Sequence, residues 1–277
     1  MKPSVIFAAA AFGWLTACPS LAQEQKEPEK IPFEGGIFTI TETKELDKVL
    51  AYDGKELARN YVAFYQRTVD LNGTKVAIFD VGGGGNACGP AAVLAWKTEA
   101  GIQSTIVGAD ECGTPPAAAT GDALYFVPYL RPGATAPVRM WSPENGLKVA
   151  GELSFVPQPG TGWADVKLEG LTYTTDFFAN AELYAAAKAL LGNDLENVAL
   201  GLSVSGGPDT TPSGLLFASG CVPHACGSAD AFIGVDVANK RLYFAQQGDL
   251  PAPKTWPGLD EWPAELKYGM TKALVKQ

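Results

Sequence analysis

The sequence predicts an α+β protein, in which a β-rich antiparallel N-terminal domain precedes a smaller α+β domain with a helix, an antiparallel sheet and a terminal helix. Three observations predict this fold class. Up to about residue 172, short β-branched and aromatic runs alternate with turn residues. Residues 180–191 then have the apolar period of a helix, and a second such stripe lies near the C-terminus. With 47% hydrophobic and 18% charged residues, the chain of 277 residues can bury a core, and its length suits two domains.

Residues 1–22 have the pattern of a secretory signal peptide. Lys2 precedes the apolar run Val5 to Ala17, which is too short to cross a bilayer as a permanent helix. Two processing sites compete: Ser20-Leu21-Ala22 suits signal peptidase I, whereas Leu15-Thr16-Ala17-Cys18 looks like a bacterial lipobox with Cys18 as the lipidated residue. Simple cleavage is slightly favoured, because Cys18 lies where an ordinary c-region would begin. In both cases the mature chain is expected in the periplasm.

A polar segment rich in Pro, Lys and Glu, residues 23–35, is expected to be a flexible lead-in to a β-rich domain of residues 36–172. The clearest element of that domain is a hairpin, in which Tyr61–Val69 and Lys75–Val81 flank an Asn72-Gly73 turn. A weaker hairpin turns at Asp53-Gly54. The glycine run 82–85 lacks the helix and the lysine of a phosphate loop and is interpreted as a wide turn. Further strands of an antiparallel meander are expected at residues 91–96, 103–107, 123–128, 138–141, 147–153 and 164–168.

Residues 177–277 are expected to form the smaller domain. Asn180 is a suitable N-cap for the helix that follows it, and Gly192 is a suitable stop. The last helix is expected to begin near Pro263, and its apolar stripe consists of Leu266, Met270 and Leu274. Between these helices we expect a short helix at 194–200 and strands at 202–205, 214–219, 231–237 and 240–246.

The cysteine count fits an exported chain. Once Cys18 is removed or acylated, Cys88, Cys112, Cys221 and Cys226 remain. An even number of cysteines in an oxidising compartment indicates two disulfides. Three pairings are formally possible, and proximity in the sequence favours Cys88 with Cys112 and Cys221 with Cys226.

The only histidine, His224, lies between two of these cysteines in the segment Gly220-Cys-Val-Pro-His-Ala-Cys-Gly-Ser228. A disulfide between Cys221 and Cys226 closes a ring of six residues and presents Pro223 and His224 at its apex. On the chain-entropy model such a short ring contributes only about 2 kcal/mol of stability, so its purpose is to fix a shape. The alternative is a structural disulfide with an incidental histidine. A zinc site needs about four ligands and lacks them here, and a Cys/His nucleophile pair needs a free thiol.

This segment resembles the CKPHDCGS loop of the Ivy family, the periplasmic inhibitors of vertebrate (c-type) lysozyme. The resemblance covers roughly the last third of the chain. It implies that Cys221 and Cys226 form the loop disulfide, that Pro223 is the rigid apex, and that His224 enters the lysozyme cleft against its two catalytic carboxylates. Two positions depart from the family pattern, since its Lys is Val222 here and its Asp is Ala225.

The sequence therefore predicts an exported lysozyme inhibitor that needs no cofactor or metal and is not an enzyme. Without its signal the chain has 20 basic and 30 acidic residues, which disfavours nucleic acid and anionic membranes as partners and permits a basic protein partner. Membrane attachment is expected only through lipidation of Cys18. The second interpretation is a non-inhibitory binding module with the same fold. A hydrolase is third, because Gly201-Leu-Ser203-Val-Ser205-Gly206 only loosely matches a nucleophile elbow.

Overall fold

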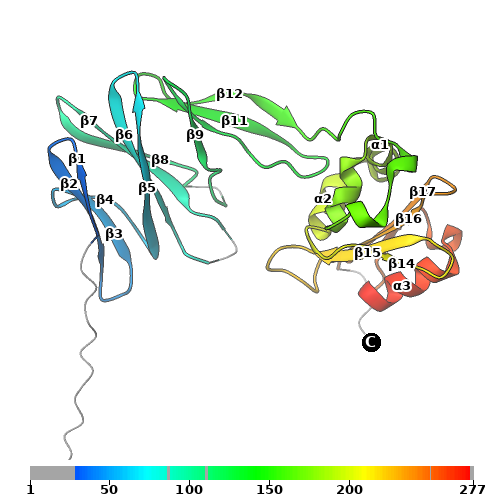
Figure 1. The fold of residues 1–277 in the computed structure, drawn as a ribbon. Coiled ribbons are helices and arrows are strands. Elements are labelled where there is room, and N and C mark those ends of the chain that lie inside the picture. Colours follow the sequence, from blue (N-terminus) through cyan, green and yellow to red (C-terminus); the bar gives the residue numbers. More distant parts are fainter. Residues whose placement is uncertain (1–28, 86–87, 110–111, 250, 275–277) are drawn as a thin grey trace, which may run out of the picture.

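The computed structural model describes residues 29–85, 88–109, 112–249 and 251–274, and its N-terminal part consists of three successive four-stranded antiparallel meanders (Figure 1). The signal peptide and the start of the lead-in lie outside the described residues. The first meander contains β1 (Glu29–Phe33), β2 (Gly36–Glu42), β3 (Lys48–Tyr52) and β4 (Lys55–Asn60); the second contains β5 (Val62–Leu71), β6 (Thr74–Gly82), β7 (Ala91–Thr98) and β8 (Gly101–Val107); the third contains β9 (Ala117–Ala119), β10 (Leu124–Phe126), β11 (Thr135–Ser142) and β12 (Gly146–Ser154).

The second meander is the middle layer of this part. Successive side chains of a strand point to opposite faces of its sheet, so neighbouring residues of β6 enter different cores. Phe79 packs with Phe38 of the first meander, whereas Ile78 packs in the cluster that includes Trp141 of the third. Both faces of β6 and β7 are therefore buried, which explains why their sequences are nearly continuous apolar runs without the alternation of a half-exposed strand.

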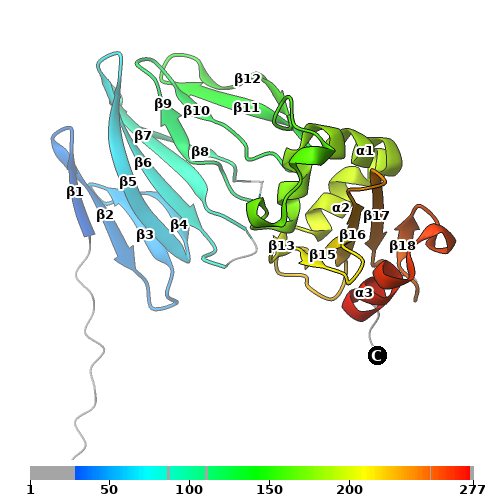
Figure 2. The ribbon, with the colours of Figure 1, turned by 45° about the vertical axis from the view of Figure 1, so that its right-hand side comes forward.

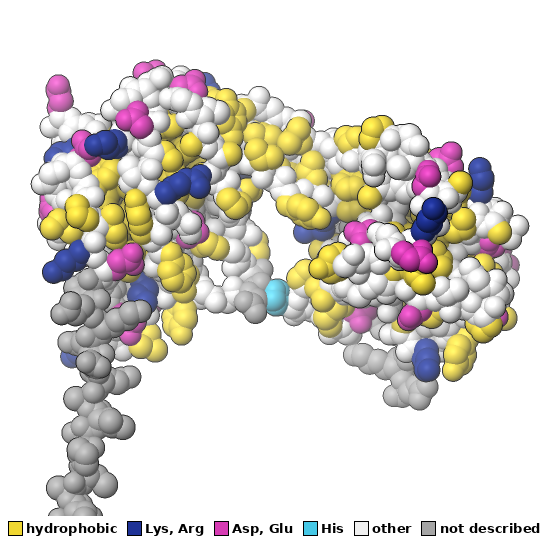
Figure 3. All heavy atoms as spheres, viewed as in Figure 1, with side chains coloured by type: hydrophobic (Ala, Val, Ile, Leu, Met, Phe, Trp, Pro, Cys, Tyr) yellow, Lys and Arg dark blue, Asp and Glu magenta, His cyan; other side chains and the backbone are white. Residues whose placement is uncertain are grey.

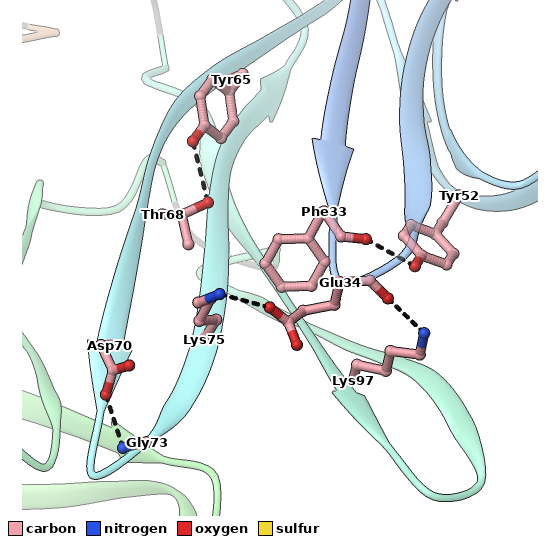
Figure 4. A network of polar contacts seen from close by, with 9 residues as sticks. All are labelled: Phe33, Glu34, Tyr52, Tyr65, Thr68, Asp70, Gly73, Lys75 and Lys97. Carbon is pink, nitrogen blue, oxygen red and sulfur yellow. Dashed lines mark hydrogen bonds and ion pairs between the residues drawn. The ribbon is translucent and has the colours of Figure 1, made fainter.

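Polar contacts join the first meander to the second at the turn between β1 and β2 (Figure 4). The Lys75 ammonium on β6 donates to Glu34 Oε1 at 2.8 Å, and the Lys97 ammonium on β7 donates to the Glu34 carbonyl oxygen. Beside them, the Tyr52 hydroxyl donates to the Phe33 carbonyl at 2.9 Å. One turn thus ties two strands of the middle layer to the outer sheet.

The C-terminal part combines a six-stranded sheet with helices on both faces (Figure 2). On one face α1 and α2 pack over Ile233 and Phe244, and on the other α3 packs over Phe232 and Tyr243. The helices are α1 (Ala181–Leu191), α2 (Leu195–Gly201) and α3 (Ala264–Leu274), and the strands are β13 (Val204–Ser205), β14 (Asp209–Thr210), β15 (Leu216–Cys221), β16 (Ala231–Asp236), β17 (Arg241–Gln246) and β18 (Lys254–Trp256). Short 3-10 turns occupy Trp163–Asp165, Leu168–Gly170, Thr174–Ala179, Gly192–Asp194 and Leu259–Glu261. No helix of the described residues has the length and hydropathy needed to cross a membrane.

The α+β class and the order of elements are confirmed, including the Asn72-Gly73 hairpin and Asn180 as the cap of α1, where its side chain accepts from the Leu183 N–H at 3.1 Å. The strand expected at 164–168 is wrong. This segment forms two 3-10 turns, because the Asp165 carboxylate accepts from the Gly162 N–H at 2.8 Å and bends the chain. The lead-in is also shorter than expected, since β1 begins at Glu29, inside residues 23–35.

Candidate functional site

The loop that contains the only histidine connects the end of β15 to the start of β16, two strands that pair antiparallel in the C-terminal sheet. Both disulfides that the sequence favours are present: Cys221 bonds Cys226 within this loop, and Cys88 bonds Cys112 across the two ends of the β7–β8 hairpin. Cys221 is the last residue of β15 and is buried, so one end of the ring is anchored in the sheet.

A tight turn forms the apex of the ring. The Ala225 N–H donates to the Val222 carbonyl at 3.0 Å, which places Pro223 and His224 at the two central positions of the turn. His224 has a φ of 63°. Proline at the first central position and a positive φ at the second are the combination of a type II turn. The prolyl ring sets the first position, and His is among the few residue types that occur in the left-handed region more often than average.

Hydrogen bonds on the C-terminal side of the ring support its shape. The Ser228 hydroxyl donates to the Ala225 carbonyl at 2.7 Å. The Gly227 N–H donates to Asp230 Oδ1 at 2.7 Å, while the Asp230 carbonyl accepts from the Gln247 N–H at 2.8 Å. Asp230 directly precedes β16, whose six residues are all buried, so it connects the loop to the core of the sheet. The supporting roles of Ser228 and Asp230 were not predicted, because in the sequence each is only a polar residue shortly before a strand.

The glycines on either side of the ring serve different purposes. Gly227 has a φ of 92°, a left-handed conformation that glycine adopts without strain, and it turns the chain directly after the ring. Gly220 lies in β15, where an added Cβ would come within 2.8 Å of the Leu202 Cα. Gly220 therefore allows β15 to approach closely the chain that leaves α2.

The His224 side chain is exposed, as is Pro223, whereas Val222 and Ala225 are half-buried. Figure 3 shows the imidazole, the one cyan side chain, at the molecular surface. The structure therefore places the six residues from Cys221 to Cys226 together in one compact projection, with the imidazole accessible to a partner.

The surroundings of Ser203 and Ser205 differ from those of a nucleophile elbow. In that motif the serine lies between a strand and a following helix. Here α2 comes first and the short strand β13 follows, and the Ser203 hydroxyl donates to the Ala199 carbonyl of α2 at 3.1 Å. Within the described parts of the chain, no cluster of three or more His, Cys, Asp or Glu side chains is arranged to hold a metal ion.

Comparisons with known proteins match two separate segments of the chain, one in the N-terminal part and one in the C-terminal part. Residues 34–154 match the model of the Y4bG N-terminal domain, and this match covers the three meanders from β2 to β12. Residues 182–276 match the family model of the inhibitor of vertebrate lysozyme (Ivy). This Ivy-like segment begins in α1, ends after α3 and contains the whole His224 loop.

One relative matches most of the chain. It is the "Uncharacterized protein y4bG" of Sinorhizobium fredii, which is 25% identical over 223 residues, a stretch that covers 80% of this chain and 81% of the relative. The similarity thus extends over both the meanders and the Ivy-like segment. No solved structure matches the chain.

Proposed function

We propose that this protein is an exported inhibitor of c-type lysozyme that acts through the loop Cys221–Cys226, with His224 as the side chain that enters the enzyme cleft. The observation that carries the proposal is an exposed imidazole at the apex of a disulfide-closed turn, within the segment that matches the Ivy family.

The imidazole of the loop is chemically complementary to the catalytic cleft of lysozyme. The lysozyme cleft contains two carboxylates, and the environment of one raises its pKa to about 6. A protonated imidazole has an N–H on each of its two ring nitrogens, so in this form it can donate one hydrogen bond to each carboxylate. The disulfide ring, the type II turn and the hydrogen bonds made by the Ser228 hydroxyl and the Asp230 carboxylate hold the loop in one shape before binding. Less conformational entropy is therefore lost on association.

The composition of the loop predicts an inhibitor of moderate affinity. Val222 and Ala225 stand where the family loop has Lys and Asp, and both are half-buried in the free protein. They contribute contact area without charge-assisted hydrogen bonds, which are about twice as strong as neutral ones. The net charge of −9 of the whole chain supports association with a basic enzyme through long-range attraction.

Export to the periplasm belongs to the same proposal. The signal-peptide pattern of residues 1–22 and the two disulfides both suit an oxidising compartment outside the cytoplasm. The intact mass of the purified mature protein distinguishes the two processing sites, since a chain that begins at Gln23 without acyl groups excludes lipidation of Cys18.

The test is lysis of cell walls by a c-type lysozyme in the presence of increasing amounts of the mature protein. His224→Gly is the informative variant, because glycine accepts the positive φ of this position while the imidazole is removed. We expect inhibition by the wild type and a loss of at least about tenfold in apparent affinity for His224→Gly, with an unchanged melting temperature. His224→Ala should lose affinity to a similar extent, because it also removes the imidazole and keeps the Cβ that His224 already has at this φ.

Asn72→Gly is the matched control. Asn72 is also exposed and left-handed, with a φ of 50°, but lies in the turn between β5 and β6 of the N-terminal part. This variant should inhibit as the wild type does. If the wild type fails to inhibit at a large molar excess, the function is that of the alternative, a non-inhibitory binding module that retains the fold. If His224→Gly inhibits equally well, the inhibition does not depend on the imidazole and the role given to His224 is wrong.

A further inference from the structure

A second segment of the chain packs against the disulfide-closed loop. It is the short connection 201–204, in which α2 ends and β13 begins. An added Cβ at Gly201 would come within 2.8 Å of the Ala229 carbonyl oxygen, and one at Gly220 would come within 2.8 Å of the Leu202 Cα. The connection therefore touches the chain on both sides of the disulfide ring, and the two segments form one continuous surface.

Val204 lies directly beside the ring on this connection. It pairs with Cys221 across β13 and β15, so the two side chains lie on the same face of the sheet. Hydrogen bonds hold the chain on either side of Val204: the Ser203 hydroxyl donates to a carbonyl of α2 at 3.1 Å, and the Thr174 N–H donates to the Ser205 hydroxyl at 3.1 Å. Val204 is nevertheless 48% exposed, so an apolar side chain is held at a fixed position next to the disulfide and faces solvent.

The two stretches that meet at the ring contain no charged side chain apart from that of His224 when it is protonated. Residues 197–208 and 210–229 include no Asp, Glu, Lys or Arg, although these four residue types make up 18% of the chain. Their exposed and half-buried apolar side chains around the ring, called here the apolar collar, are Val204, Val222, Pro223 and Ala225. The imidazole is thus surrounded by groups that neither attract water strongly nor compete for its hydrogen bonds.

An apolar collar suits the surroundings of one of the two lysozyme carboxylates. That carboxylate lies in an apolar pocket, which is the cause of its raised pKa. Apolar contacts around a hydrogen bond exclude water from it, and a hydrogen bond between charged groups is stronger where water is excluded. A collar of charged side chains would instead have to lose its own hydration on binding. The collar therefore favours the hydrogen bonds that His224 donates.

We propose that Val204 is a second contact residue of the inhibitor, which packs against the apolar wall of the lysozyme cleft and shields the hydrogen bonds of His224 from water. This inference rests on the proposed function of the loop and extends its binding surface to a second segment of the chain. Because Val204 acts partly through the imidazole, its removal should matter most when the imidazole is present.

The lysis assay with variants of Val204 in the mature protein tests this contact. Val204→Ser removes most of the apolar side chain and should weaken the apparent affinity for lysozyme roughly fivefold or more. Val204→Lys should weaken it as well, although the added positive charge is attracted by the carboxylates of the cleft. Val204→Ile keeps an apolar β-branched side chain and should inhibit as the wild type does. The melting temperatures should be unchanged, because the side chain at 204 is half-exposed.

A double-mutant cycle with His224→Gly tests the shielding of the hydrogen bonds. Val204→Ser should weaken the apparent affinity less than about twofold in the His224→Gly protein, because no hydrogen bond of an imidazole remains to be shielded. Val149→Ser is the control. Val149 is also a strand valine and is 60% exposed, but it lies on β12 of the N-terminal part, so its loss should leave the inhibition unchanged.

The outcomes separate this inference from the proposed function. If the wild type inhibits and His224→Gly does not, but Val204→Ser keeps full affinity, the contact at Val204 is wrong and the role of the loop stands. Tighter binding by Val204→Lys, or an equal loss for Val204→Ser with and without the imidazole, also overturns the inference. A wild type that fails to inhibit overturns the proposed function, and this inference with it.

Discussion

At the scale of single residues, Asp80 is a carboxylate in a strand whose other residues are mostly apolar and buried. It lies in β6 among buried apolar residues, and the Gln66 amide donates to its Oδ2 at 2.5 Å. Burial raises the pKa of the Asp80 carboxyl, and the hydrogen bond from Gln66 only partly opposes this rise. A raised pKa in the folded state means that the folded protein binds this proton more tightly than the unfolded chain does. The ionised carboxylate therefore costs stability at neutral pH.

Asp80→Asn should stabilise the protein at pH 7, because the amide removes the charge and still accepts the bond from Gln66. In the wild type, the loss of stability from the ionised Asp80 develops as the pH rises from the ordinary carboxyl pKa of 3.8 to the raised pKa of the folded state. The stability gained by Asp80→Asn should therefore disappear below pH 3.8. We expect a melting temperature higher by about 1–3 °C at pH 7 and no difference in acid. Glu152→Gln, an exposed carboxylate on β12, is the control and should change neither value. An equal rise in melting temperature for Asp80→Asn at pH 7 and in acid would show that the charge of Asp80 is not the cause.

The residues of the candidate site were only partly predictable. Two cysteines around a lone histidine were sufficient to predict the ring and an outward His224. The supporting bonds of Ser228 and Asp230 were not, because they depend on the angle at which the loop enters β16. The role of Gly220 was also hidden, since it arises from contact with Leu202, a residue of another element.

At the scale of elements, the middle meander determines the stability of the N-terminal part. Phe79 of β6 is fully buried and its ring contacts those of Phe38 and Tyr65, with centroids 4.9 and 5.5 Å apart. It therefore joins the first and second meanders. A cavity at this position cannot close without movement of two sheets.

Phe79→Ala should lower the free energy of unfolding by about 3–5 kcal/mol, the usual range for a buried phenylalanine. Phe64→Ala, in the neighbouring strand β5, is the control, because this ring is 56% exposed and its loss should cost less than about 0.5 kcal/mol. Urea unfolding followed by tryptophan fluorescence measures both. Similar losses of unfolding free energy for the two variants would mean that burial of Phe79 between the first and second meanders does not stabilise the N-terminal part.

The long strands β5, β6 and β7 were predictable because eight to ten residues are enough to define a pattern and an end. Two of the short strands, β9 and β14, were not. β9 consists of three alanines, which have low β propensity, and β14 contains only Asp209 and Thr210. Such segments become strands because a neighbour offers free backbone groups, as β15 does for β14. This pairing depends on the tertiary structure and leaves no pattern in the sequence of the short strand.

At the scale of the whole molecule, the two parts have separate hydrophobic cores. Two clusters contain only residues from Phe33 to Trp141, and the other two contain only residues after Ser154. The parts also touch outside these cores: Gly133, before β11, lies so close to the start of α2 that an added Cβ would be 3.1 Å from the Glu196 nitrogen. This contact is small compared with either core.

Residues 155–277 alone should therefore fold and inhibit. Their circular dichroism should show the expected helix content, and their apparent affinity for lysozyme should lie within about threefold of that of the mature chain. Thermal unfolding and the lysis assay measure the two properties. An unfolded fragment would show that the N-terminal part is needed for the Ivy-like segment to fold, whereas a folded fragment without inhibition would assign part of the binding surface to the meanders.

The ring between Cys221 and Cys226 has a consequence for how such proteins diverge. Its shape depends on the two cysteines, on Pro223 and on the left-handed position of His224, whereas the side chains at 222 and 225 take no part in the turn. Mutations at these two positions alter what a partner meets and leave the fold unchanged. If the loop binds lysozyme as proposed, single substitutions at these positions can change its affinity without an unstable intermediate.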